Sequence, residues 1–137
     1  MATSDKGIIR YKNNEWESMN VGIPLLSQNF TSITVAPDGS IWAGSTASQL
    51  IHFHDNTFTL FTTGASKPIT SVVVAGTDTV WCSTFGAGLI KFDRTTWSSY
   101  SMANAKLPTN DIFCLATFDA GNLIFSIPGG KVLLIKN

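Results

Sequence analysis

The sequence is poor in charged residues. Asp, Glu, Lys and Arg make up 13% of its 137 residues, nine acidic against nine basic, and no run of one sign occurs. Phosphate backbones and anionic lipid headgroups are attracted by an excess of basic side chains, which this sequence lacks. We therefore expect neither a nucleic acid nor a membrane surface as a partner.

Long apolar runs are also absent. A membrane helix needs about 18 consecutive apolar residues, and no segment approaches that length. Residues 1–16 do not have the cationic start and apolar stretch of a secretory signal peptide. The default expectation is a cytoplasmic protein, or an extracytoplasmic one if the sequence is an excerpt of a longer sensor.

Residues suited to metal binding or catalysis are few. The two cysteines, Cys82 and Cys114, stand in separate apolar runs, which favours two buried, reduced side chains over a disulfide. His52 and His54 would face the same side of a strand, as two metal ligands do, but no Cys or carboxylate is placed to complete a site. No catalytic triad signature, phosphate loop or carboxylate pair stands out. We therefore predict no catalytic residues, no metal and no cofactor.

Helical periodicity is missing, and an internal repeat is present instead. Residues 32–62 align without a gap with residues 71–101, at an offset of 39 positions. A third copy starts near residue 107, where Asp111 takes the place of Asn29 and Pro68. The matched pairs of the first two copies are Trp42 with Trp81, Leu50 with Leu89, Phe53 with Phe92, and Phe58 with Trp97.

The first residues form the back half of another copy. Tyr11 aligns with Phe53 and Trp16 with Phe58, both at an offset of 42 positions. Apolar and polar residues alternate within every copy, which predicts four short antiparallel strands per unit of about 40 residues, as in a propeller blade. We predict one all-β, partial β-propeller domain over residues 1–137. Its parts are a third- and fourth-strand fragment (1–20), two blades (29–62 and 68–101) and an incomplete blade (107–137).

Residues that recur in every copy are expected to serve packing. A large flat side chain such as Trp42 or Trp81 fills the wedge between neighbouring blades. Gly39 follows an aspartate in a hairpin and predicts a turn with positive φ. Because a catalytic residue needs to appear only once, the repeated motif predicts architecture and carries no chemistry.

The segments "APDGSIWAGS", "GAGLIKFDRTTWSSY" and "KLPTNDI" resemble the two-component regulator propeller repeat. The resemblance covers nearly the whole chain, and the third copy departs from it with Ile124 where tryptophan is expected. It implies blades of an extracellular sensor propeller of bacterial membrane-bound histidine kinases, which bind carbohydrate-like ligands. This sequence shows no kinase, membrane helix or signal peptide, so the resemblance supports the fold more than the signalling role.

Three blades do not close a propeller, which is generally built from four to eight. We expect copies of the chain to close the ring. A homodimer would give six blades, with each N-terminal strand completing the last blade of its partner, whereas a homotrimer would give nine, a rare number. Residues 7–12 also resemble a third strand, so they must displace the strand near residue 133, add outside it or peel away.

Loops that occur once are the expected place for a ligand. The loops between blades, and between second and third strands, form the face where propellers usually bind ligands, and here they offer amides, one aromatic ring and few charges. The prediction is a non-catalytic binding or scaffold module for a small polar or carbohydrate-like ligand. The alternative is a lyase-like enzyme with a site assembled from several blades. The candidate binding residues are Gln28, Asn29, Gln49, Lys67, Phe85, Asn110 and Asp111.

Overall fold

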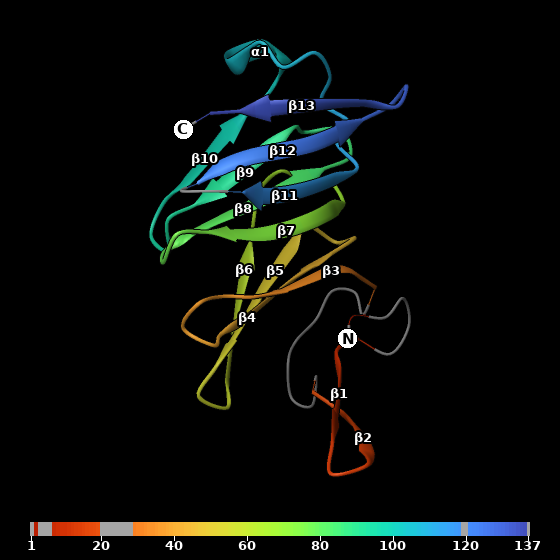
Figure 1. Cartoon of the computed structure of the whole chain (residues 1–137), viewed down its shortest axis with the longest axis vertical. Helices are drawn as coiled ribbons and strands as arrows, with labels where there is room; N and C mark the ends of the chain where they lie inside the picture. Colours follow the sequence, from red (N-terminus) through yellow and green to blue (C-terminus); the bar gives the residue numbers. More distant parts are fainter. Residues whose placement is uncertain (1, 3–6, 20–28, 119–120, 137) are drawn as a thin grey trace.

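The computed structural model describes residues 2, 7–19, 29–118 and 121–136. These residues form a fan of small antiparallel sheets with almost no helix (Figure 1). Strands that follow one another along the chain pair with one another within each sheet, as in propeller blades. The predicted all-β fold built from blades is confirmed.

Two of the sheets have four strands each. The first blade contains β3 (Phe30–Val35), β4 (Ile41–Ser45), β5 (Gln49–His54) and β6 (Thr57–Thr62), in that spatial order. The second blade contains β7 (Ile69–Ala75), β8 (Thr79–Thr84), β9 (Leu89–Phe92) and β10 (Trp97–Tyr100), again in the order of the sequence.

The remaining strands form two smaller sheets. The third blade contains β11 (Cys114–Phe118), β12 (Asn122–Ile127) and β13 (Lys131–Ile135), and the N-terminal hairpin contains β1 (Ile9–Lys12) and β2 (Glu15–Ser18). Within the chain, β13 pairs with β12 and β1 pairs with β2, so the two third-strand segments coexist.

Strand register confirms the alignment of the copies. Phe53 lies opposite Phe58 in the first blade, and Phe92 lies opposite Trp97 in the second. The N-terminal hairpin places Tyr11 opposite Trp16 in the same way. The hairpin therefore has the pairing of the third and fourth strands of a blade.

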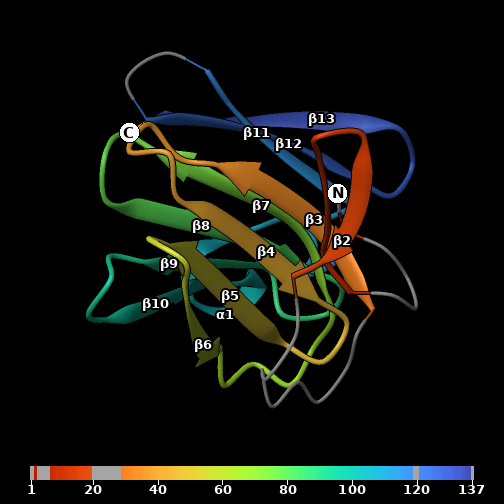
Figure 2. The same ribbon diagram turned by 90° about the horizontal axis from the view of Figure 1, so that it is seen from below.

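The innermost strands hold neighbouring blades together. β3 lies beside β7, and β7 lies beside β11 (Figures 1 and 2). The Thr31 hydroxyl donates a 2.6 Å hydrogen bond to the carbonyl of Ile69, and the Thr70 hydroxyl donates one of 2.6 Å to the carbonyl of Ile112. The same contact is thus made at both junctions, because Thr31 and Thr70 occupy equivalent positions in the repeat.

Apolar cores fill the space between the blades. Trp42, which is 1% exposed, lies in a cluster with Ile69 and Val72 of the second blade. Trp81 packs against a second cluster, which contains Leu115 and Phe125 of the third blade. The predicted packing of the repeated tryptophans between blades is confirmed.

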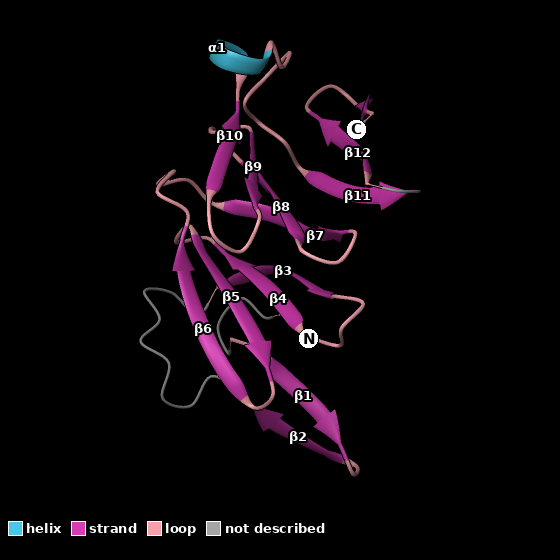
Figure 3. Cartoon of the chain, turned by 90° about the vertical axis from the view of Figure 1, so that its left-hand side faces the viewer, coloured by secondary structure: helices cyan, strands magenta, loops and turns pink. Residues whose placement is uncertain are grey.

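One short helix interrupts the all-β pattern. Met102–Ala105 form a four-residue helix, α1, in the connection between the second and third blades (Figure 3). The Ser101 backbone N–H donates a 2.7 Å hydrogen bond to Asn104 Oδ1, which closes the first turn. So short a helix gives no 3.6-residue apolar pattern, since its stability comes from local capping. Within the described part of the chain, no helix has the length and apolarity needed to cross a membrane.

The cysteine prediction is half right. Both thiols are free, and Cys82 is buried between the first and second blades, but Cys114 is exposed. Cys114 points away from the second blade at the start of β11, on a side of the sheet that the described residues leave uncovered. Apolar neighbours in the sequence do not bury a residue when its side of the sheet has no facing blade.

This difference predicts the reactivity of the two thiols. Burial raises the pKa of the Cys82 thiol to about 12, so its reactive thiolate is scarce at neutral pH. We expect a chromogenic disulfide reagent to titrate one thiol per native chain and two in concentrated urea. A Cys114→Ser variant should show none in the native state and one in urea, and a native variant that still reacts would contradict the assignment.

Candidate functional site

The connecting loops gather at one end of the blades. The Phe85 N–H donates a 3.1 Å hydrogen bond to the carbonyl of Pro68, in the connection from the first blade to the second. The N–H groups of Gly86 and Gly88 donate 3.1 and 2.9 Å hydrogen bonds to the carbonyl of Asn110, in the following connection. Backbone hydrogen bonds therefore join the loop between β8 and β9 to both connections. We call these three segments, at one end of the blades, the loop cluster.

Four of the predicted site residues meet in this loop cluster: Lys67, Phe85, Asn110 and Asp111. Phe85 forms an isolated antiparallel bridge with Asp111. The Lys67 side chain lies along the Gly86 backbone, since a Cβ on Gly86 would be 3.2 Å from Lys67 Cδ. These four residues therefore lie together, although they come from three separate segments of the chain.

The other three predicted residues are placed differently. Asn29 is exposed, and its carbonyl accepts a 3.0 Å hydrogen bond from the Thr46 N–H at the first blade. Gln49 is only 1% exposed, so the structure does not present its side chain to a ligand. Gln28 lies outside the described residues. Gln49 is the first residue of β5, and the first three residues of this strand are buried on both sides of the sheet, so its side chain lies inside the molecule.

Asn110 stabilises the loop cluster through its own bonds. Its Oδ1 accepts a 2.8 Å hydrogen bond from the Met102 N–H at the start of α1, in addition to the two bonds accepted by its carbonyl. An amide engaged in this way orders the loops. Asn110 therefore acts as a support, and Phe85 and Lys67 are the exposed predicted residues within the loop cluster.

The main feature that sequence reasoning missed is Phe113. Its ring is 6.0 Å from the ring of Phe85 and nearly parallel to it, at 10°. The two rings are 49% and 48% exposed, respectively. Phe113 stands at the repeat position of Thr31 and Thr70, so the break in the repeat was the signal that could have identified it. Together Phe85 and Phe113 form an exposed aromatic platform.

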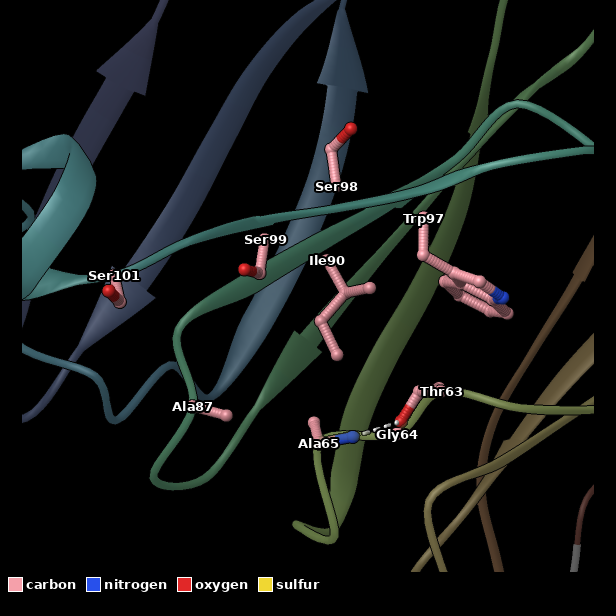
Figure 4. A pocket seen from close by; sticks show the side chains of 9 residues that line it. All are labelled: Thr63, Gly64, Ala65, Ala87, Ile90, Trp97, Ser98, Ser99 and Ser101. Carbon is pink, nitrogen blue, oxygen red and sulfur yellow. Dashed lines mark hydrogen bonds between the residues drawn. The ribbon is translucent and has the colours of Figure 1, made fainter.

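A groove of about 420 Å³ adjoins the loop cluster at Ala87 and runs between the first and second blades. Its apolar side chains are Ala65, Ala87, Ile90 and Trp97 (Figure 4). Hydroxyl groups line the rest, from β10, from Ser101 and from the segment after β6. The lining residues are Thr63, Gly64, Ala65, Ala87, Ile90, Trp97, Ser98, Ser99 and Ser101. Hydroxyls around an indole ring suit a neutral polar ligand.

The two histidines lie elsewhere, on β5 of the first blade. Their rings are 6.0 Å apart and almost parallel, so they do face the same side of the strand. The His52 ring stacks on Trp42 at 4.2 Å, and burial, followed by the nearby positive charge of Arg94, lowers the pKa of His52. The His52 imidazole thus belongs to the packing of Trp42. Among the residues that the model describes, no three or more His, Cys, Asp or Glu side chains form a metal-binding group.

Arg94 adds an ionic contact between blades at the end opposite the loop cluster. One of its terminal nitrogens is 3.2 Å from Asp38 Oδ2, and its guanidinium carbon lies 5.7 Å from the centre of the Trp42 ring. Hydrogen bonds from Ser40, with a smaller contribution from Arg94, hold the pKa of Asp38 well below its ordinary range. These polar groups join two blades, and the loop cluster remains the candidate binding site.

The fold and the loop cluster define the class of protein, a set of β-propeller blades whose connections gather at one end. No protein-family model and no curated protein matches the sequence. Solved structures with the same fold nevertheless resemble it.

Three of these structures illustrate the likeness. The extracellular domain of a putative one-component system from B. thetaiotaomicron has a TM-score of 0.77 at 18% identity, over 98% of this chain and 19% of that one. The extracellular domain of a putative hybrid two-component system from the same organism has a TM-score of 0.76 at 18% identity, over 97% of this chain and 18% of that one. A catalytically inactive virginiamycin B lyase from Staphylococcus aureus, with quinupristin, has a TM-score of 0.58 at 14% identity, over 79% of this chain and 41% of that one.

These identities establish the fold alone. Two of the similar structures are extracellular domains of bacterial signalling systems, so the resemblance to two-component regulator propellers holds at the level of architecture. The chain spans about a fifth of the length of those two domains.

Proposed function

We propose that this protein is a non-catalytic binding module that takes a neutral, carbohydrate-like ligand at the loop cluster. The aromatic platform of Phe85 and Phe113 carries the proposal. Exposed parallel rings offer apolar faces on which the C–H face of a sugar ring stacks, and ordinary surfaces rarely hold two such rings together without a function.

The surroundings of the platform fit the same ligand. Lys67 is a donor beside it, and the hydroxyl-lined groove begins two residues after Phe85, at Ala87. Neither feature concentrates charge of one sign, which favours a neutral ligand over an anion or a cation. The similar extracellular domains of signalling systems support a sensor-like role for such a module.

Self-assembly is the second part of the proposed function. The described chain provides two complete blades, one three-stranded blade and one hairpin, whereas propellers generally have four to eight blades. We propose that copies of the chain join to complete the ring. A homodimer is the smallest such assembly, and a homotrimer is the next.

The ligand proposal predicts that truncating the platform weakens sugar binding. Phe85→Ala and Phe113→Ala should each weaken, by about tenfold, the binding of any sugar that the parent protein binds, because stacking on one ring is lost. The measurement is an amide NMR titration with a panel of neutral hexasaccharides of glucose, mannose and galactose. Because both residues are half exposed, the variants should stay folded.

A matched control is Val35→Ala, an exposed apolar truncation at the far end of β3. It should bind the same sugar like the parent protein. If no member of the panel shifts a loop-cluster amide at about 1 mM, or if the Val35 variant loses binding as much as the Phe85 variant, the carbohydrate proposal fails.

A further inference from the structure

The third blade has an apolar outer side, which we call the end face. On β12, Leu123, Phe125 and Ile127 are buried toward the second blade, so Ile124 and Ser126 point away from it. Register places Leu134 beside Ile124 and Val132 beside Ser126. Val132 and Leu134 are 61% and 47% exposed, and no described residue covers them. The end face consists of Cys114, Ala116, Ile124, Ser126, Val132 and Leu134.

The end face is also hollowed. A groove of about 230 Å³ runs along it, between Cys114 and Ala116 on one strand and Val132 on another. Its lining is almost entirely apolar, with Ser126 as the one polar side chain in it. Apolar side chains from another surface would fill such a groove favourably.

The N-terminal hairpin carries an exposed aromatic pair at the other end of the chain. Tyr11 and Trp16 are 56% and 62% exposed, and their ring centres are 4.8 Å apart. Ile8 is buried in a cluster with Phe30 and Ile51 of the first blade. Because side chains alternate along a strand, Tyr11 lies on the side of the hairpin away from Ile8. We call the side with Tyr11 and Trp16 the start face.

A contact between two blades of the same chain shows how two such faces pack against each other in this fold. At the junction of the first and second blades, Trp42 of the first blade lies 6.2 Å from Phe92 of the second, ring centre to ring centre. In the repeat, Ile124 occupies the position of Trp42, and Tyr11 occupies the position of Phe92. The end face and the start face are therefore the two halves of one contact that the chain already makes within itself.

We infer that the start face of one copy packs on the end face of a second copy, with Tyr11 and Trp16 over Ile124, Val132 and Leu134. This inference rests on the self-assembly in the proposed function and names the surfaces that perform it. The contact joins unlike faces, so two copies related by a two-fold axis make it twice. It continues the interblade packing of Trp42 and Trp81 from one chain to the next.

Paired variants test the two faces separately. Val132→Glu with Leu134→Glu places charge on the end face, and Tyr11→Ser with Trp16→Ser removes the aromatic rings of the start face. All four side chains are exposed, so these variants should fold. The controls are Lys131→Glu, on the opposite side of β13, and Glu15→Ser, beside Trp16 on the opposite side of β2.

Light scattering after size exclusion measures the mass. The parent protein and both controls should have twice the mass of one chain, and both double variants should have the mass of one. A parent protein that stays monomeric at about 1 mM overturns the inference together with self-assembly. A dimer that survives either double variant overturns this contact only, and self-assembly then uses other surfaces.

Discussion

Replacing Gly88 by alanine should cost about 4 kcal/mol or more of unfolding free energy, a large part of the stability of a small domain. A Cβ on Gly88 would stand 2.2 Å from the carbonyl oxygen of Tyr100 on the adjacent strand β10. The backbone there has φ +79°, which alanine adopts only with strain. The Gly88 N–H and carbonyl are also bonded, to Asn110 and Thr84 respectively, so the loop cannot shift without losing both bonds.

Gly39→Ala is the matched control for this prediction. Gly39 has a similar φ of +82°, but a Cβ there would meet no atom within 4 Å. We expect it to cost only the conformational strain, about 1–2 kcal/mol. Urea unfolding of both variants gives the difference from the midpoints. Equal costs would show that the Tyr100 carbonyl yields easily, contrary to the tight strand pairing at this position.

The second large effect is expected at Trp42. Trp42→Ala should destabilise the chain by about 3–5 kcal/mol, because a large side chain that is 1% exposed leaves a cavity between two blades. The substitution also removes the ring that stacks on His52 and that the Arg94 guanidinium approaches. The expected result in urea is a lower midpoint with an unchanged slope.

Trp16→Ala is the control, since Trp16 is 62% exposed. Measured at low protein concentration, where association does not contribute, it should change stability by about 0.5 kcal/mol or less. A comparable loss in the two variants would mean that the tryptophan between the blades contributes no more than one on the surface. The interblade packing would then not be the source of stability.

The repeat made the fold predictable. Trp42 aligns with Trp81, Phe53 with Phe92 and Phe58 with Trp97, and these matches predicted the same strands in both copies. An apolar residue that recurs with each blade has the same packing environment each time, so pattern and burial agree. The helix α1 escaped prediction because four residues held by capping bonds carry no periodic signal.

The candidate site was predictable only in part. The turn positions brought Lys67, Phe85 and Asp111 to one end, since loops at equivalent places in the blades meet there. Gln49 was predicted to be available but is buried, and Phe113, which was not among the predicted residues, lies exposed beside Phe85. Loop residues follow no period, so which of them faces solvent depends on hydrogen bonds between distant segments.

The sequence by itself determined the kind of unit and the number of copies, because strand alternation and the 39-residue offset are local properties of the chain. Only the tertiary structure decided which sides of the blades are covered. Cys82 and Cys114 occur in similar apolar strands, yet one is buried between two blades and the other lies on the open end face. Burial depends on what packs across a sheet, and that is a property of the whole arrangement of blades.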